Sequence, residues 1–389
     1  MRIGFTIIGG NNWMGGHRYL KNLISTLTNN PEFNVTPILF IGDDLSEDQE
    51  RLICEYPPES IYRDKSFNKM SSLNNYIESI IRGRLPHIEC AFRSAKIDVF
   101  FEWAKFIGWN ARIPILAWIP DLQHRRLPKL FSNLEWIKRE IGFRLQARFG
   151  RTIMVSSESS KNDFIDLYQF ANCRRITITK FATPTITENK IAQREELGKK
   201  YSLPENYFYL PNQFWKHKNH ITIVESLRIL KENGMCPYVI CSGPTRDLKG
   251  NENYNFIMGM VKKYELNDNL IYLGVVPYTD LLGLMCSSIA VINPSLFEGW
   301  STTVEEAKAL GVPLILSDIK VHREQAPSAL FFPAEDSQKA ALSLSGKNIN
   351  YKKYIFRNVI PESEKLRIFA KEFSHAAHIA MMNARKKII

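Results

Sequence analysis

The sequence predicts an α/β protein built on two parallel sheets, one in each of two domains. Residues 3–27 and residues 289–310 each have the order strand, loop, helix, and the second segment continues into a further strand at 314–318. A helix between two strands of one sheet makes those strands parallel, because it returns the chain across the face of the sheet. The chain of 389 residues is also longer than the chains that usually fold around a single hydrophobic core, and its length suits two domains of about 100 to 200 residues each.

The first strand is expected at residues 3–8 and leads into a glycine-rich loop that ends in Gly15 and Gly16. Apolar residues then recur at helical spacing between Leu20 and Leu27, which predicts a helix. Glycines at such a turn let backbone amides approach a phosphate or a sugar closely. The spacing is not the G-x-G-x-x-G of dinucleotide sites, so a plain tight turn remains the alternative.

A second apolar run, residues 115–119, ends in the polar residues Asp121 and His124. In a parallel sheet, ligands bind beyond the carboxyl ends of the strands, so this position suits an acceptor-binding residue. The alternative for His124 is a structural histidine that caps the following loop.

The second domain is expected to open with a strand at 207–210 and a loop that contains Asn212, Gln213, Lys216 and Lys218. A lysine in this loop could neutralise a departing diphosphate. The alternative is that these lysines belong to an ordinary solvated loop.

The most informative segment follows the apolar run at 289–292, which predicts a buried strand that Gly299 prevents from continuing. A helix is expected to begin near Ser301, with Thr302 and Glu305 spaced as a capping box.

Two carboxylates flank this helix start: Glu298 lies on the preceding loop and Glu306 lies one turn inside the helix. Free amides near the helix start would attract a diphosphate, but carboxylates beside it would repel the anion. Both groups make sense if they bind the hydroxyl groups of a sugar and a ribose. The alternative is that Glu298 and Glu306 are solvated surface charges.

The spacing of Glu298 and Glu306 is similar to the E-x(7)-E motif of retaining glycosyltransferases of family four, and Ala307, Gly311 and Pro313 follow as in that family. The resemblance implies the GT-B architecture, in which two Rossmann-like domains face a central cleft and a C-terminal helix crosses back to the first domain.

The expected division of the chain is an acceptor-side domain at 1–185, a nucleotide-sugar domain at 186–355 and the returning helix at 356–389. The break between the two domains is placed where prolines, threonines and a charged stretch interrupt the strand pattern near residues 183–200.

The resemblance also implies roles for individual residues, with Glu298 contacting the transferred sugar and Glu306 the donor ribose. The expected catalytic residues are Asp121, His124, Lys218 and Glu298. The expected donor-binding residues are Gly15, Gly16, Asn212, Gln213, Lys218, Val276, Glu298, Gly299, Trp300, Ser301, Thr302 and Glu306.

This sequence departs from the family pattern at two places. Pro120 occupies the usual histidine position of the first domain, so Asp121 and His124 are predicted to act jointly. Asn212 and Gln213 stand where an arginine is expected, and Lys216 or an arginine of the first domain could supply the missing charge.

The predicted function is the retaining transfer of a hexose or deoxyhexose from a nucleoside diphosphate sugar to a glycan or lipid-linked acceptor, in bacterial surface polysaccharide synthesis. The cysteines and histidines form no metal-ligand pattern and no Asp-x-Asp triplet occurs, so neither a metal nor another cofactor is expected. Two alternatives stay open: a GT-B nucleotide-sugar epimerase, and a non-catalytic nucleic-acid-binding protein suggested by the net charge of +11, although nucleic acid is not the expected partner.

Part of the positive charge is concentrated at residues 124–151, which contain eight Lys and Arg but only two Glu. In the same segment Leu134, Ile137, Ile141 and Leu145 recur at helical spacing. A basic amphipathic helix can rest on anionic lipid, each cation contributing about 1 kcal/mol. The alternative is a core-facing helix with a solvated basic side. The scattered cysteines and the absence of an apolar run of about 20 residues predict a cytoplasmic protein, with peripheral contact at the inner membrane face as a hypothesis.

Overall fold

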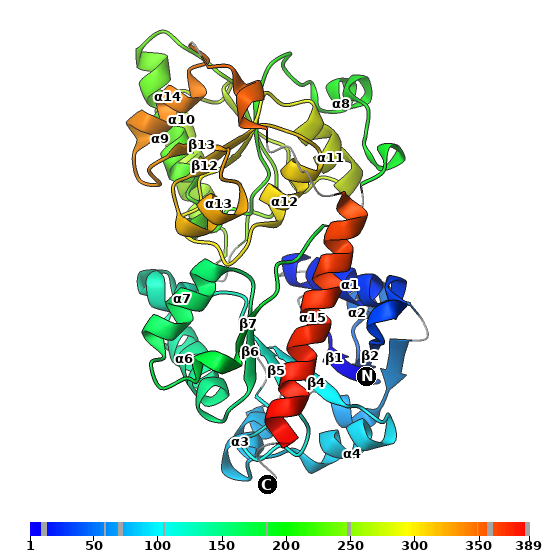
Figure 1. Cartoon of the computed structure of the whole chain (residues 1–389). Helices are drawn as coiled ribbons and strands as arrows, with labels where there is room; N and C mark the ends of the chain where they lie inside the picture. The colour runs from blue at the N-terminus through cyan, green and yellow to red at the C-terminus, as the bar shows by residue number, and fades with distance from the viewer. Residues whose placement is uncertain are drawn as a thin grey trace. The chain divides into compact units, whose positions relative to one another are not determined.

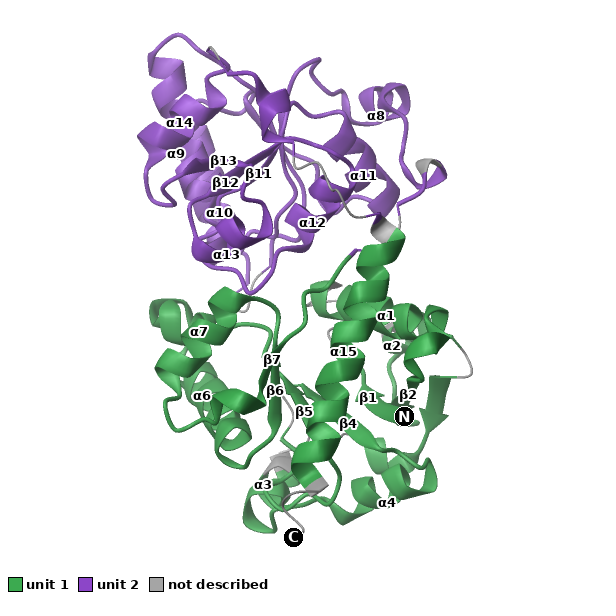
Figure 2. Ribbon diagram, viewed as in Figure 1, with its two compact units in different colours: residues 1–182, 363–389 green, residues 183–362 purple. Residues whose placement is uncertain are grey.

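The chain forms two compact units, which Figure 2 shows in different colours: Met1–Ala182 with Ser363–Ile389, and Thr183–Glu362. The computed structural model describes residues 1–8, 14–57, 60–68, 73–103, 106–183, 186–246, 250–347, 349–355 and 361–385. Residues 9–13 of the glycine-rich loop and residues 184–185 at the expected domain boundary lie outside this part.

The N-terminal unit contains a seven-stranded parallel sheet with the order β3-β2-β1-β4-β5-β6-β7. Its strands are β1 (Arg2–Thr6), β2 (Thr36–Ile41), β3 (Ile61–Arg63), β4 (Val99–Trp103), β5 (Ile115–Trp118), β6 (Thr152–Val155) and β7 (Ile176–Ile178). Its helices are α1 (Met14–Asn29), α2 (Glu47–Ile53), α3 (Leu73–Ile81), α4 (Pro86–Ser94), α5 (Gln123–Arg126), α6 (Asn133–Arg148) and α7 (Glu158–Leu167), with α15 (Glu362–Arg385) added from the end of the chain.

Both faces of this sheet are buried, as is usual for parallel sheets. In β2, Leu39 and Ile41 face the core that α1, α2 and α15 complete, while Ile38 and Phe40 face the core that α4, α6 and α7 complete. Side chains alternate between the faces of a strand, so a continuous apolar run serves two cores at once.

The C-terminal helix α15 packs on the N-terminal unit, as expected. Phe369 and Phe373 of α15 are fully buried, and the Phe373 ring lies 5.9 Å from that of Phe5 in β1. Figure 1 shows α15 in red along this unit. Apolar residues at helical spacing on α15 therefore belong to the same hydrophobic core as β1.

The C-terminal unit contains a six-stranded parallel sheet with the order β10-β9-β8-β11-β12-β13. Its strands are β8 (Phe208–Leu210), β9 (Val239–Cys241), β10 (Leu270–Tyr272), β11 (Val291–Asn293), β12 (Leu314–Ser317) and β13 (Leu330–Phe332). Its helices are α8 (Arg194–Tyr201), α9 (His220–Glu232), α10 (Glu252–Lys263), α11 (Tyr278–Cys286), α12 (Thr302–Ala309), α13 (Lys320–Gln325) and α14 (Ser337–Leu344).

In this second sheet, the order of the strands reverses between β8 and β11. The chain builds from β8 outward through β9 to β10 and then returns to the other side of β8 as β11. Ligands of open parallel sheets bind beyond the carboxyl ends of the strands at such a switch point. The loops after β8 and β11, which contain Lys218 and Glu298, therefore lie where the topology itself predicts a site.

Candidate functional site

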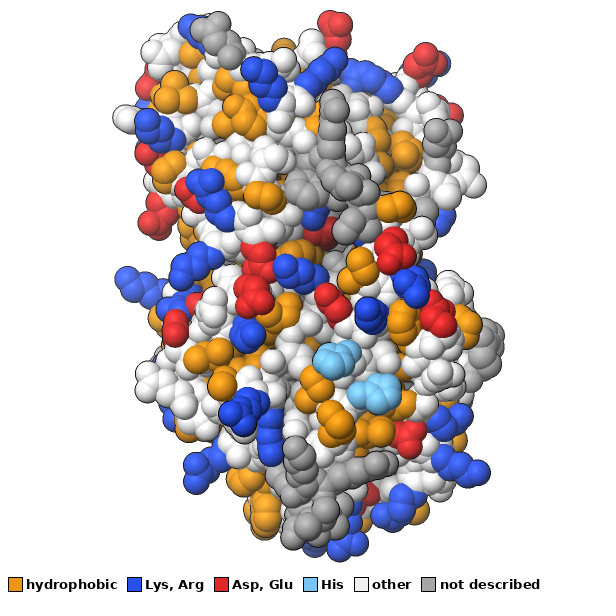
Figure 3. All heavy atoms as spheres, viewed as in Figure 1, with side chains coloured by type: hydrophobic (Ala, Val, Ile, Leu, Met, Phe, Trp, Pro, Cys, Tyr) orange, Lys and Arg blue, Asp and Glu red, His pale blue; other side chains and the backbone are white. Residues whose placement is uncertain are grey.

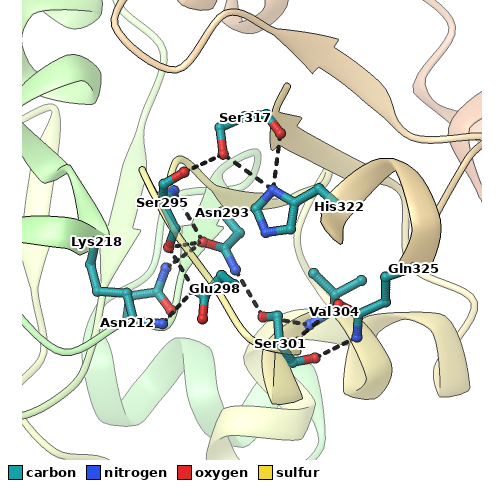
Figure 4. Close-up of polar contacts among 10 residues, drawn as sticks. All are labelled: Asn212, Lys218, Asn293, Ser295, Glu298, Ser301, Val304, Ser317, His322 and Gln325. Atoms are coloured by element: carbon teal, nitrogen blue, oxygen red, sulfur yellow. Dashed lines mark hydrogen bonds and ion pairs between the residues drawn. The ribbon is translucent and has the colours of Figure 1, made fainter. Parts of the chain in front are cut away.

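Glu298, on the loop after β11, is held by two side chains from different parts of the unit (Figure 4). Lys218 Nζ lies 2.6 Å from Glu298 Oε1, and Ser295 Oγ donates to the same oxygen at 2.7 Å. The side chains of Lys218 and Glu298 are 16% and 10% exposed. The structure thus brings together two of the predicted catalytic residues, which lie 80 positions apart in the chain.

Charge decides the protonation state of Glu298. Burial raises the pKa of this carboxyl, but the positive charges of Lys218 and His217 and the hydrogen bond from Lys218, with a smaller contribution from His322, lower the pKa to about 2. At neutral pH Glu298 is therefore a carboxylate. It can accept hydrogen bonds from hydroxyl groups, but it cannot donate a proton.

Two asparagines join the loops on either side of the switch point. The buried Asn212 donates from Nδ2 to Asn293 Oδ1 at 3.2 Å, and Asn293 Nδ2 donates to Ser301 Oγ at 2.9 Å. Asn212 therefore ties the loop after β8 to the start of α12. It does not itself restore the positive charge that is missing from this position.

The remaining charge of this loop lies on a single 3-10 turn, Lys216–Lys218. Lys216 is exposed, whereas Lys218 points at Glu298. The next residue, Asn219, adopts a left-handed conformation with φ 56°, and its side chain donates to the carbonyl oxygens of Pro294 and Ala334. These bonds fix the turn against the loop after β11, so Lys218 is directed inward.

The loops after β9 and β10 complete the same edge of the sheet. Gly243 has φ 139°, and a Cβ at this position would lie 2.7 Å from Asn212 O, so only glycine permits this approach. Gly243 N donates to Gly274 O at 2.9 Å. The half-buried residues Gln213 and Val276 lie beside these contacts in the chain, which places both predicted donor-binding residues on this edge.

The start of α12 differs from the prediction in one respect. Ser301, and not Thr302, is the N-cap, because its Oγ accepts from Val304 N. The predicted capping box is wrong, since Glu305 binds Gln325 Nε2 at 2.9 Å instead.

The backbone N–H of Ser301 donates to Gln325 Oε1 at 3.1 Å, so this amide is not available to a ligand. The first bond along the helix is Glu305 N to Ser301 O, so the amides of Thr302 and Thr303 precede it and are available to an anion.

Glu306 and the residues before the helix are also held inside the unit. Glu306 is 4% exposed. Its charge adds to burial in raising the pKa of Tyr209, which places Glu306 near β8. Gly299 is buried and Trp300 is half-buried. The alternative that Glu298 and Glu306 are solvated surface charges is therefore wrong.

In the N-terminal unit, α1 begins at Met14. Gly15 and Gly16 consequently form its first turn, with Gly15 exposed and Gly16 buried. Their predicted contact with the donor remains a prediction.

Asp121 and His124 follow β5 in the same unit but have different surroundings. Asp121 is 27% exposed, and its Oδ1 accepts from Gln123 N at 3.0 Å and Arg139 Nη1 at 3.3 Å. His124 is fully buried, and its Nε2 lies 3.2 Å from Glu140 Oε2.

His124 is enclosed by the rings of Phe131, Trp136 and Phe143. Burial lowers the pKa of His124, although the hydrogen bond to Glu140 opposes this. The geometry favours a structural role for His124, and Asp121 alone keeps partial access to solvent. The predicted joint role stays a prediction.

The sequence analysis did not assign Asn293, Ser317, His322 or Gln325 to the site. Asn293 and Ser317 end two neighbouring strands, β11 and β12, and a polar residue at the end of an apolar run is a signal that could have identified them. His322 and Gln325 lie in the short helix α13 and carry no comparable signal, because only the fold brings them to the start of α12.

The described residues contain neither a cluster suited to a metal ion nor a helix suited to crossing a membrane. No three His, Cys, Asp or Glu side chains in the described ranges are grouped so that they could hold a metal ion. None of the helices in those ranges combines the length and the apolar character that crossing a bilayer requires.

The C-terminal unit is similar in sequence to known proteins. Residues 193–343 match the family described as Glycosyl transferases group 1. This segment contains the hydrogen-bonded site residues described above, from Asn212 after β8 to Gln325 in α13. The O-antigen chain mannosyltransferase RfbU of Salmonella typhimurium is 26% identical over 157 residues. This match spans 40% of the present chain and 41% of that relative's length.

Solved structures extend the likeness to the whole chain. The crystal structure of Anabaena Alr3699/HepE in complex with UDP and glucose has a TM-score of 0.65 and 14% identity, covering 100% of this chain and 98% of that one. WaaG, a glycosyltransferase involved in lipopolysaccharide biosynthesis, has a TM-score of 0.59 and 14% identity, covering 97% and 95%. At this identity the likeness concerns the fold alone, and it confirms the predicted GT-B fold.

Proposed function

We propose that this chain, whose residues 193–343 belong to the glycosyl transferases group 1 family, is a retaining glycosyltransferase that uses a nucleoside diphosphate sugar. The transferred group is a hexose or deoxyhexose, and the acceptor is a glycan or a lipid-linked saccharide. The observation that carries the proposal is the Lys218–Glu298 pair at 2.6 Å, located at the switch point of the sheet beside the start of α12.

The diphosphate of the donor is assigned to the amides of Thr302 and Thr303 and to the ammonium group of Lys218. Helix-terminal amides and a lysine stabilise the negative charge that develops on the leaving group. An ammonium group has three N–H donors, so Lys218 can hold Glu298 and a phosphate oxygen together.

The carboxylate of Glu298 then accepts hydrogen bonds from the sugar, and Glu306 binds the ribose. The bond between the anomeric carbon and the phosphate oxygen breaks as the acceptor oxygen bonds to that carbon on the same face. The acceptor proton passes to the donor phosphate. The enzyme's part is positioning and charge stabilisation, because a carboxylate with a pKa of about 2 is not a general acid at neutral pH.

The relatives support both the donor class and the setting. One solved structure of the same fold holds UDP and glucose, the partial relative RfbU is an O-antigen chain mannosyltransferase, and WaaG takes part in lipopolysaccharide biosynthesis. We infer a role in bacterial surface polysaccharide synthesis. On the acceptor side, Asp121 is the better candidate because it is partly exposed.

Contact with an anionic membrane is a separate part of the proposal and is supported by α6. Leu134, Ile137 and Ile141 are 64%, 46% and 40% exposed, so the helix does not bury this stripe in the core. Lys138 and Arg148 on the same helix are also exposed. Exposed apolar and basic groups on one helix are complementary to the apolar and anionic groups of a lipid surface.

Sedimentation with vesicles tests this contact, with neutral vesicles compared with vesicles that contain anionic lipid. The chain is expected to bind the anionic vesicles, and replacing Leu134, Ile137 and Ile141 by serine is expected to abolish that binding. Binding that these replacements leave unchanged would refute the assignment to α6.

Incubation with a panel of nucleotide sugars, with and without glycan acceptors, tests the enzymatic proposal. A glycosyltransferase releases free nucleoside diphosphate at a rate that rises with the correct acceptor. An epimerase would interconvert its substrate with no acceptor. A protein that showed no release, and bound nucleic acid with steep salt dependence, would refute the proposal.

The surface offers the nucleic-acid alternative no support on the face drawn in Figure 3. Among the side chains coloured there, Lys and Arg are interspersed with acidic and hydrophobic groups and form no continuous basic band. A backbone-tracking site would need such a band.

A further inference from the structure

His322, on α13, is a fully buried histidine with one ring nitrogen that is not hydrogen-bonded. Its Nδ1 lies 2.9 Å from the carbonyl oxygen of Ser317. Because a carbonyl oxygen only accepts, Nδ1 carries the proton and donates. In the neutral ring Nε2 is then an acceptor, and it has no hydrogen-bond partner among the residues that the structure describes.

The ring is held rigidly beside the loop that carries Glu298. Ser317 Oγ donates to Ser295 O at 2.6 Å and also lies 3.1 Å from His322 Nδ1. Figure 4 shows the Nδ1 edge of the ring against Ser317 and the opposite edge turned to the side where Asn293 and Glu298 lie. The Nε2 edge of the ring therefore faces the side of Asn293 and Glu298, away from its structural partner Ser317.

The charge state of the ring limits what Nε2 can bind. Burial lowers the pKa of His322 to about 4, against the opposing effect of Glu298, so the ring is neutral at pH 7. A neutral nitrogen acceptor pairs with a hydroxyl or an N–H group and not with a phosphate oxygen. A buried acceptor that is left without a donor destabilises the fold, so a ligand hydroxyl would satisfy it.

We propose that His322 Nε2 accepts a hydrogen bond from a hydroxyl group of the transferred sugar, next to the hydroxyl bound by Glu298. The proposal rests on the nucleotide-sugar function given above. It adds a residue that distinguishes sugars by the presence and orientation of one hydroxyl group. Two acceptors of different kinds, a carboxylate and an imidazole, then face two hydroxyls. A sugar with one of these hydroxyls absent or inverted would leave Nε2 without a donor.

Two replacements separate this role from structural support. In His322→Asn, the amide can donate to Ser317 O as Nδ1 does, but no atom replaces Nε2. In His322→Gln, the amide oxygen can reach the position of Nε2 and restore an acceptor. Both side chains are uncharged, so the charge near Glu298 is the same in the two variants and in the wild-type protein.

The test measures dissociation constants, and the affinity for the nucleoside diphosphate controls for any loss of folded protein, because partial unfolding would weaken the binding of every ligand by the same factor. The ligands are the preferred nucleotide sugar, its monodeoxy analogues and the nucleoside diphosphate alone. His322→Asn is expected to weaken binding of the nucleotide sugar about tenfold, with the affinity for nucleoside diphosphate unchanged and with partial recovery in His322→Gln. One deoxy analogue is expected to bind the wild-type protein about tenfold more weakly and to bind His322→Asn no more weakly than the parent donor does.

Two outcomes would overturn the proposal: equal losses for the nucleotide sugar and the nucleoside diphosphate, or discrimination among the deoxy analogues that His322→Asn leaves intact. If the wild-type protein binds no nucleotide sugar at all, the proposed function fails, and this result is distinct from both of them.

Discussion

Lys218→Met would remove the cation at the centre of the proposed site and keep most of the side chain's apolar stem. In the structure the ammonium group lies 2.6 Å from Glu298 Oε1, and both side chains are at most 16% exposed. The replacement therefore leaves a nearly buried carboxylate that still accepts a hydrogen bond from Ser295 Oγ.

Two effects are expected, one on folding stability and one on the reaction rate. Removing one partner of a buried ion pair costs about 3 to 5 kcal/mol of folding stability, and the residual exposure places this pair at about 3 kcal/mol. Loss of a positioned donor to the leaving group raises the barrier by about 2.7 to 4 kcal/mol, which lowers kcat by a factor of about 100 to 1,000.

A pH profile provides a second signature. Burial raises the pKa of Glu298 and Lys218 is the main group that lowers it. Without Lys218 the folded-state pKa rises, so Glu298 becomes protonated as the pH falls through a range in which the wild-type carboxylate stays charged. The activity of Lys218→Met is thus expected to decline on acidification more steeply than that of the wild-type protein.

Release of nucleoside diphosphate in the presence of acceptor measures kcat, and urea unfolding measures stability. Lys216→Met is the matched control, because Lys216 is exposed on the same turn, and Lys218→Arg tests whether charge alone suffices. The reasoning is refuted if Lys218→Met keeps kcat within a few-fold of the Lys216→Met value.

Three further outcomes are expected. Burial lowers the pKa of His220 to about 3 and that of His322 to about 4, below the ordinary 6.5, so the stability that each contributes is fully present above pH 6.5 and is lost as the pH falls toward 4. By pH 4.5 each histidine should have lowered the free energy of unfolding by about 2 to 3 kcal/mol. A urea midpoint that is flat between pH 7 and 4.5 would contradict this. Arg151→Met should cost about 3 to 5 kcal/mol in urea unfolding, because Glu102 is fully buried and its Oε1 lies 3.2 Å from Arg151 Nε, and adding Glu102→Gln should recover part of the loss. Phe373→Ala should cost about 3 kcal/mol and speed hydrogen exchange in α15 more than in α12, and equal effects on both helices would argue against the packing described.

The elements of the fold were largely readable from local patterns. The periodic apolar residues of α1 predicted a helix whose apolar side is buried, and the short apolar runs predicted β5, β8, β11 and β12. This is possible because the spacing of apolar residues directly encodes the face that each element buries.

The predictions that failed depended on competition between neighbouring groups. Ser301 replaced Thr302 as the N-cap because Gln325 binds both the amide of Ser301 and the carboxylate of Glu305. Exposure, and not competition, contradicts the core-facing alternative for the apolar stripe of α6, because Leu134 and Ile137 are exposed.

The order of residues along the chain sets the chemistry available to the site: Glu298 and Glu306 are spaced across a helix start, and a lysine lies on a loop after a strand. The fold is what makes β8 and β11 neighbours, and it thereby brings Lys218 to Glu298 and places the unpaired Nε2 of His322 on the same side. Spacing along the chain records which residues share one element, whereas the order of strands in a sheet sets which distant elements meet, and a charge or a lone pair acquires its properties from those neighbours.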